Sequence, residues 1–126
     1  MIDEVQKKLL AIGKDGCYFL CILKACDVNS AKILSLYDYC VTMKWMDSDC
    51  FVKNPEAIVG FLLSKKVICY KSDNEEKDAL FNIARFYNDR TKFSHFCLIT
   101  DTGIWDPLGT SVTASEGRIA DYRIFK

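Results

Sequence analysis

The spacing of apolar residues indicates that the first half of the chain is helical. Apolar residues at Val5, Leu9 and Ile12 predict a short opening helix, and the glycines of segment 13–16 are expected to break it. The next run, from Cys17 to Asp27, is apolar on nearly every side. A helix of that composition is typically buried, so we predict a central helix there.

Two further helices carry capping residues at their starts. Asn29 or Ser30 can accept hydrogen bonds from the first N–H groups of a helix over residues 33–39. Asn54 followed by Pro55 predicts a fourth helix, because proline lacks the N–H that the first helical position leaves unpaired. The chain remains largely apolar from there to residue 63, which is consistent with a buried helix face.

The second half of the chain is made of short apolar runs that predict strands. Residues 80–87 fit either a helix or a strand, and we favour the strand. A polar stretch at 73–78 and a turn at 101–103 separate the runs. Helices followed by antiparallel strands imply an α+β domain. The predicted strands are Val67–Tyr70, Leu80–Tyr87, Phe93–Thr100, Ile104–Asp106 and Arg118–Phe125.

Length and charge limit the class of protein. The chain has 126 residues, which suits a single domain over 1–126, and half of them are apolar, enough for a core without disulfides or metals. Lysine plus arginine equals aspartate plus glutamate at 17 each, so the formal net charge is zero. Nucleic acids and anionic membranes are bound through an excess of basic residues, so neither is an expected partner. The sequence predicts no particular oligomeric state.

The N-terminus and the cysteines indicate a cytoplasmic protein. Residues 1–10 form an amphipathic pattern rather than a secretion signal, and the longest apolar run, Cys17–Leu23, is far shorter than the ~20 residues that cross a bilayer. The seven cysteines are then expected to be free thiols. No CxxC pair occurs and the only histidine, His95, is remote in sequence, so we predict no metal and no cofactor.

Cys17 is the first candidate for chemistry because it opens the predicted central helix. The first turn of a helix has N–H groups without an internal acceptor, and its positive end favours a thiolate. The same N–H groups can stabilise an oxyanion. We expect Asp15 to cap this helix and Gly16 to leave space beside the sulfur. The alternative is that Cys17 is one buried cysteine among seven.

His95 and Asp106 are the candidates for a base and for the acid that orients it. His95 is the only imidazole in the chain, and Asp106 ends the next predicted strand. A two-residue turn at 101–102 would put Asp106 opposite Cys97 and diagonal to His95 on one face. A three-residue turn at 101–103 would put the two side chains on opposite faces. Each residue alone also fits a structural role, at a strand end or before a proline.

Three strings together carry a family resemblance: GKDGCYFLCILK around Cys17, FSHFCLITDTGIWDPLG around His95 and Asp106, and the tail GRIADYRIF. Their order resembles papain-like cysteine peptidases, above all bacteriocin-leader-processing peptidases and small cysteine-peptidase-like proteins of phages and prophages. The resemblance runs from Gly13 to Phe125. It implies a papain-like fold, with N-terminal helices packed on a C-terminal antiparallel sheet. It also implies a triad of Cys17, His95 and Asp106 that hydrolyses amide bonds in a peptide or protein.

The chain departs from that family at the oxyanion hole. Ala11 stands where the leader peptidases place a glutamine, and the nearest glutamine, Gln6, could serve only if a loop before Cys17 folds back. The backbone N–H of Cys17 is the remaining donor. Losing one such donor costs an enzyme roughly 10²–10³ in rate. Two alternatives therefore stay open: a papain-like binding module, such as a phage accessory protein, and an acyl transferase, whose fold generally needs a longer chain.

Overall fold

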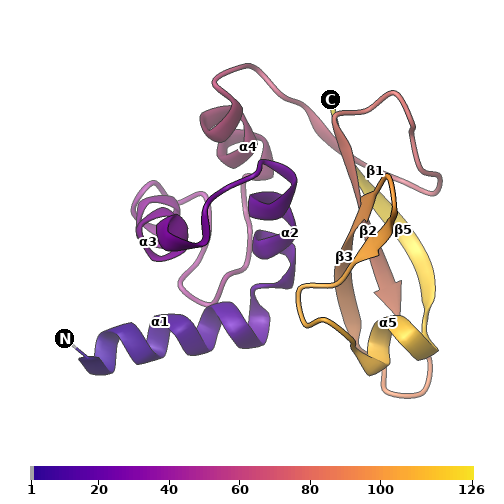
Figure 1. The fold of residues 1–126 in the computed structure, drawn as a ribbon, viewed down its shortest axis with the longest axis horizontal. Helices are drawn as coiled ribbons and strands as arrows, with labels where there is room; N and C mark the ends of the chain where they lie inside the picture. The colour runs from indigo at the N-terminus through magenta and orange to yellow at the C-terminus, as the bar shows by residue number, and fades with distance from the viewer. Residues whose placement is uncertain (1) are drawn as a thin grey trace. The chain divides into compact units, whose positions relative to one another are not determined.

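The computed structural model describes residues 2–126, and the chain divides into two compact units, Met1–Lys66 and Val67–Lys126. We call them the helical unit and the sheet unit. The helices come first, and the antiparallel sheet follows with one short helix (Figure 1). The α+β class predicted from the sequence is therefore confirmed. Within residues 2–126, no helix has both the length and the apolar character needed to cross a membrane.

The first helix is longer than predicted. Helix α1 spans Ile2–Asp15 and passes through Gly13, so the expected break over 13–16 is wrong except at its last residue. An exposed glycine inside a helix costs only about 1 kcal/mol, which the rest of α1 tolerates. The helix ends at Asp15, and the N–H of the next residue, Gly16, donates to the carbonyl of Ile12 at 3.0 Å. A Cβ at Gly16 would lie 2.3 Å from that oxygen, so the chain can turn this tightly only with glycine there.

Helix α2 spans Cys17–Ala25 and buries four apolar side chains, as expected for a central helix. Its N-cap is Gly16, and no side chain caps it. The expected cap by Asp15 is wrong because this residue still belongs to the last turn of α1. The buried residues of α2 are Phe19, Cys21, Ile22 and Leu23.

The cap predicted for the fourth helix is confirmed, whereas Asn29 caps a 3₁₀ turn before the third helix, whose own N-cap residue, Lys32, makes no side-chain cap bond. The side chain of Asn29 accepts a hydrogen bond from Ala31 N at 2.8 Å, where a 3₁₀ turn over Ser30–Lys32 leads into α3, Ile33–Thr42. Asn54 accepts from Ala57 N at 3.0 Å and starts α4, Pro55–Leu63. Local sequence therefore sets the start of the 3₁₀ turn and the start of α4.

The sheet unit has the strand order β1-β5-β2-β3-β4, and each neighbouring pair is antiparallel. The strand favoured at residues 80–87 is confirmed, and the last predicted strand has the predicted bounds. The first strand starts two residues later than predicted. A short helix, α5, at Val112–Glu116 was not predicted. The strands are β1 Cys69–Ser72, β2 Phe81–Tyr87, β3 Ser94–Thr100, β4 Gly103–Trp105 and β5 Arg118–Phe125.

The two faces of the sheet carry different side chains. On one face, which we call the His95 face, His95 and Cys97 lie across from Phe86 and Ala84 of β2, and Ala114 of α5 packs against this group. The opposite face, which we call the Arg85 face, carries a group of charged side chains around Asp121. Because side chains alternate along a strand, the strand register assigns each group to its face.

Candidate functional site

The hairpin between β3 and β4 decides whether His95 and Asp106 can meet. Thr100 pairs with Gly103 and Leu98 pairs with Trp105, so the turn has two residues, Asp101 and Thr102. Asp106 is next in this register, across from Cys97 and on the His95 face. The two-residue alternative is therefore the correct one.

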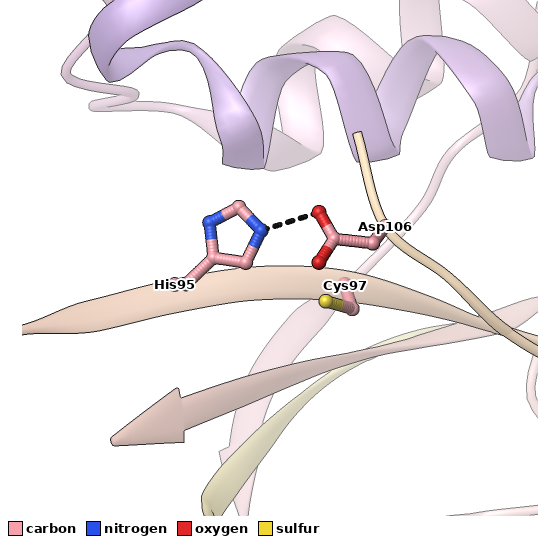
Figure 2. A group of neighbouring side chains, drawn as sticks. All are labelled: His95, Cys97 and Asp106. Atoms are coloured by element: carbon pink, nitrogen blue, oxygen red, sulfur yellow. Dashed lines mark hydrogen bonds and ion pairs between the residues drawn. The ribbon is translucent and has the colours of Figure 1, made fainter. Parts of the chain in front are cut away.

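His95 and Asp106 form a buried hydrogen-bonded pair. The distance from His95 Nε2 to Asp106 Oδ1 is 2.7 Å, and their side chains are 8% and 9% exposed. Figure 2 shows one ring nitrogen directed at the carboxylate, while the other ring nitrogen points away from it. The pair is thus almost completely shielded from water. In such a buried environment a charge-assisted hydrogen bond is stronger than at the surface.

Two further donors hold the Asp106 carboxylate in place. Leu108 N donates to Oδ1 at 2.8 Å, and the Ser111 hydroxyl donates to Oδ2 at 2.8 Å. Burial by itself raises the pKa of Asp106, but the bonds from His95, Leu108 and Ser111 outweigh it and lower that pKa below its usual value. Asp106 is therefore ionised at neutral pH. An ionised carboxylate only accepts hydrogen bonds, so Nε2 carries a proton and Nδ1 is the basic nitrogen of the neutral ring.

Ser111 is a site residue that the sequence did not reveal. Its hydroxyl both donates to Asp106 and accepts from Ala114 N at 3.2 Å, so it caps α5 as well. The backbone N–H of Gly109 donates to the Asp106 carbonyl at 2.9 Å and closes a turn over residues 106–109, which leads toward Ser111. A serine five residues after the aspartate, just before a short helix, is too common a pattern to identify this role alone.

Cys97 lies beside the pair, and the three residues offer one donor atom each within 4.8 Å of one another (Figure 2). Zinc accepts such a combination of nitrogen, sulfur and oxygen ligands. However, Nε2 and Oδ1 are hydrogen-bonded at 2.7 Å, which is shorter than the roughly 3.3 Å between two ligands of a tetrahedral zinc. A metal would have to break that bond. The arrangement therefore fits a histidine–carboxylate pair beside a buried thiol better than a metal centre.

Cys17, in the helical unit, lies where the sequence predicts, at the first position of α2. Its side chain is half-buried, and the N–H groups of that first turn have no acceptor inside the helix. The close contact with Ile12 is by itself sufficient to require a glycine at position 16. Cys17 is thus positioned by the backbone of the α1–α2 turn.

Other thiols of the helical unit are held in the protonated form. Burial raises the pKa values of Cys26 and Cys40 to about 11. Burial, with smaller contributions from nearby groups including Asp15 and Cys17, raises the pKa of Cys50 to about 11 as well. These three thiols are weak nucleophiles at neutral pH because almost none of each is thiolate.

A family model described as a protein of unknown function, DUF261, matches residues 1–126. The chain belongs to the DUF261 family. No curated protein and no solved structure matches it.

Two positions that bear on the oxyanion hole of this DUF261 chain, Ala11 and the candidate donor Gln6, lie on α1. Ala11 is inside that helix and has no side-chain donor, while Gln6 is exposed on its surface. No loop lies between Gln6 and Asp15, because both belong to one continuous helix and are about 13.5 Å apart along its axis at 1.5 Å per residue. The fold-back that Gln6 required is therefore absent. The first turn of α2 is the remaining candidate for an oxyanion hole.

Proposed function

We propose that this protein is a cysteine-type amide hydrolase with a papain-like fold, acting on a peptide or protein. Cys17 is the nucleophile, His95 is the base and then the acid, and Asp106 orients His95. The observation that carries the proposal is the His95–Asp106 pair: a buried imidazole whose Nε2 is held at 2.7 Å by an ionised carboxylate. Such a partner fixes the ring and its tautomer and stabilises the imidazolium that forms during catalysis.

The proposed reaction transfers one proton at a time. Nδ1 of His95 takes the proton of the Cys17 thiol, and the thiolate adds to the amide carbonyl carbon. The oxyanion accepts hydrogen bonds from first-turn N–H groups of α2, including that of Cys17. Nδ1–H then protonates the leaving amine, which departs and leaves a thioester on Cys17. Water attacks the thioester as Nδ1 takes its proton, and that proton returns to sulfur as the carboxylic acid product leaves.

The other carboxylate contacts explain why Asp106 would suit this role. Leu108 and Ser111 give the Asp106 carboxylate two further hydrogen bonds, so its charge is stabilised without a second cation. A lysine or arginine in their place would weaken the attraction between the carboxylate and the imidazolium. Both donors are neutral, so among residues 2–126 His95 is the one side chain that can form an ion pair with Asp106.

Hydrolysis of fluorogenic peptide libraries tests the proposal. Wild type is expected to turn over at least one library, and Cys17→Ser and His95→Gln are each expected to lower kcat/KM by about 10³-fold or more. Cys69→Ala is the matched control, because Cys69 is also a half-exposed thiol but lies on β1. Circular dichroism and urea titration establish that each variant folds.

Two results would overturn the hydrolase. One is turnover that survives Cys17→Ser at the wild-type rate. The other is saturable peptide binding by wild type, with no turnover and no thioester on Cys17 in intact-mass spectra. The second result would favour the binding module, for which the lack of a side-chain donor at Ala11 provides a reason.

A further inference from the structure

The Arg85 face of the sheet holds a buried carboxylate with three cations around it. The Asp121 side chain is 4% exposed and accepts one bifurcated hydrogen bond from Arg85 Nε–H, at 3.1 and 3.2 Å, and one from Nη2 at 2.8 Å. Arg123 donates to the same carboxylate from Nη1, and Lys71 Nζ lies 3.5 Å from Oδ2. Strand register explains the convergence, because Arg85 pairs with Asp121 and Lys71 pairs with Arg123.

The positive charge of this group exceeds the negative charge of the one carboxylate that it surrounds. Three cations around one carboxylate leave a local charge of +2, and Asp121 is the only carboxylate of residues 2–126 within ion-pair distance of them. One arginine already satisfies Asp121 through its forked N–H groups. The other two cations repel each other and Arg85 without a second anion to offset them. An excess of this kind at a solvent-accessible position is typical of an anion site.

Each of the two arginines also has a further side-chain contact and is partly exposed. Arg85 Nη1 donates to the Ser94 hydroxyl at 2.8 Å, and the guanidinium carbon of Arg123 lies 5.5 Å from the centre of the Phe96 ring. These contacts restrict the rotamers of both arginines, while their side chains stay 24% and 23% exposed. Lys71 is 64% exposed at the neighbouring strand. A bound ligand would therefore meet two held guanidinium groups and one flexible ammonium group.

We propose that Arg85, Arg123 and Lys71 bind a phosphate monoester. A phosphate monoester carries close to two negative charges at neutral pH and three acceptor oxygens, which matches a local charge of +2 and the arrangement of two guanidinium groups. Asp121 orients the arginines and does not contact the ligand. The proposal is independent of the hydrolase, because this group lies on the Arg85 face while His95 and Asp106 lie on the His95 face.

The first probe is inorganic phosphate. Its binding to the 126-residue chain is monitored through the Nε–H signals of the arginines in ¹H–¹⁵N spectra. We expect saturable shifts of the Arg85 and Arg123 signals that sodium chloride at equal ionic strength does not reproduce. A phosphoserine peptide and a nucleoside monophosphate are then titrated separately, to show whether the phosphate belongs to a protein or to a small molecule. The tighter of the two identifies the source.

Two variants test the assignment to these residues. Lys71→Gln removes an exposed cation and leaves the Arg85–Asp121 pair intact, so it is expected to weaken phosphate binding by about threefold to fivefold. Arg90→Gln is the matched control, because Arg90 is an exposed arginine of the same unit that pairs with Glu116. Equal effects of the two variants, or shifts that chloride reproduces, would overturn the proposal and indicate general charge screening only.

Discussion

The helical unit and the sheet unit position their candidate groups by different means. Cys17 is fixed by backbone geometry: α1 ends where the Gly16 N–H bonds to Ile12, and α2 begins at the next residue. His95 is fixed by side chains, since Asp106 holds its ring and Ser111 holds Asp106. The Arg85 face likewise depends on side chains, through Asp121.

This difference determines which substitutions should disturb each unit. A site built on backbone contacts has little tolerance for an added Cβ, whereas a site built on hydrogen bonds responds to the loss of single donors and to pH. Substitutions of the two kinds should therefore separate backbone positioning from side-chain positioning.

The largest effect is expected in the helical unit, from Gly16→Ala. The new Cβ would lie 2.3 Å from the Ile12 carbonyl oxygen, so the α1–α2 turn must open, at a cost of about 3 kcal/mol in the free energy of unfolding. Gly13→Ala is the matched control: nothing lies within 4 Å of its Cβ, and α1 should gain about 0.5–1 kcal/mol. Urea titration measures both. Equal values for the two variants would contradict a backbone-fixed turn.

The next effect is an acid-dependent loss of stability through Asp121. Burial raises its pKa, but the hydrogen bonds and charges of Arg85 and Arg123 lower it overall from 3.8 to about 2. The folded pKa is therefore below the unfolded one, so this stabilisation is present above about pH 4 and is lost as the pH falls toward 2. A shift of this size corresponds to about 2 kcal/mol.

The test compares the urea midpoints of wild type and Asp121→Asn from pH 5 to pH 2.5. Wild type should lose stability more steeply than the variant over that interval, because only wild type carries the Asp121 carboxylate. Asp73→Asn, which changes an exposed aspartate after β1, should follow wild type. Parallel curves for wild type and Asp121→Asn would refute the assignment of the low pKa to this group of charges.

A smaller effect is expected from Ser111→Ala, which removes the cap of α5 and one donor to Asp106. Loss of a serine cap typically costs about 1 kcal/mol, and one acceptor of a nearly buried carboxylate loses its partner. Ser115→Ala changes an exposed serine of the same helix and should be close to neutral. A cost at Ser111 no larger than that at Ser115 would mean that this hydroxyl does not support Asp106.

Local signals account for the parts of the fold that the sequence predicts well. Asn54 and Pro55 set the start of α4, and the alternation over residues 118–125 sets β5, because caps and strand periodicity are properties of adjacent residues. Helix α5 escaped prediction because it has only five residues. The passage of α1 through Gly13 was missed because a single exposed glycine is a weak helix breaker.

The sites were predictable only as far as local register allows. The hairpin of β3 and β4 joins His95 and Asp106 over a short segment, so the sequence limited their geometry to two alternatives. Arg85 and Asp121 are 36 residues apart, and their pairing depends on the order of strands across the sheet. No local pattern carries that information, so this group of charges emerged only from the fold.

The rate of iodoacetamide reaction at Cys17, followed by peptide mass mapping from pH 4.5 to 9, tests the central claim most directly. Cys69, a thiol of the same exposure class that lies on β1, is the internal standard. If His95 takes the Cys17 proton, Cys17 reacts faster than Cys69 near pH 6, and His95→Gln abolishes the excess while leaving Cys69 unchanged. Equal rates at the two cysteines, unaltered by His95→Gln, would contradict the proposed triad.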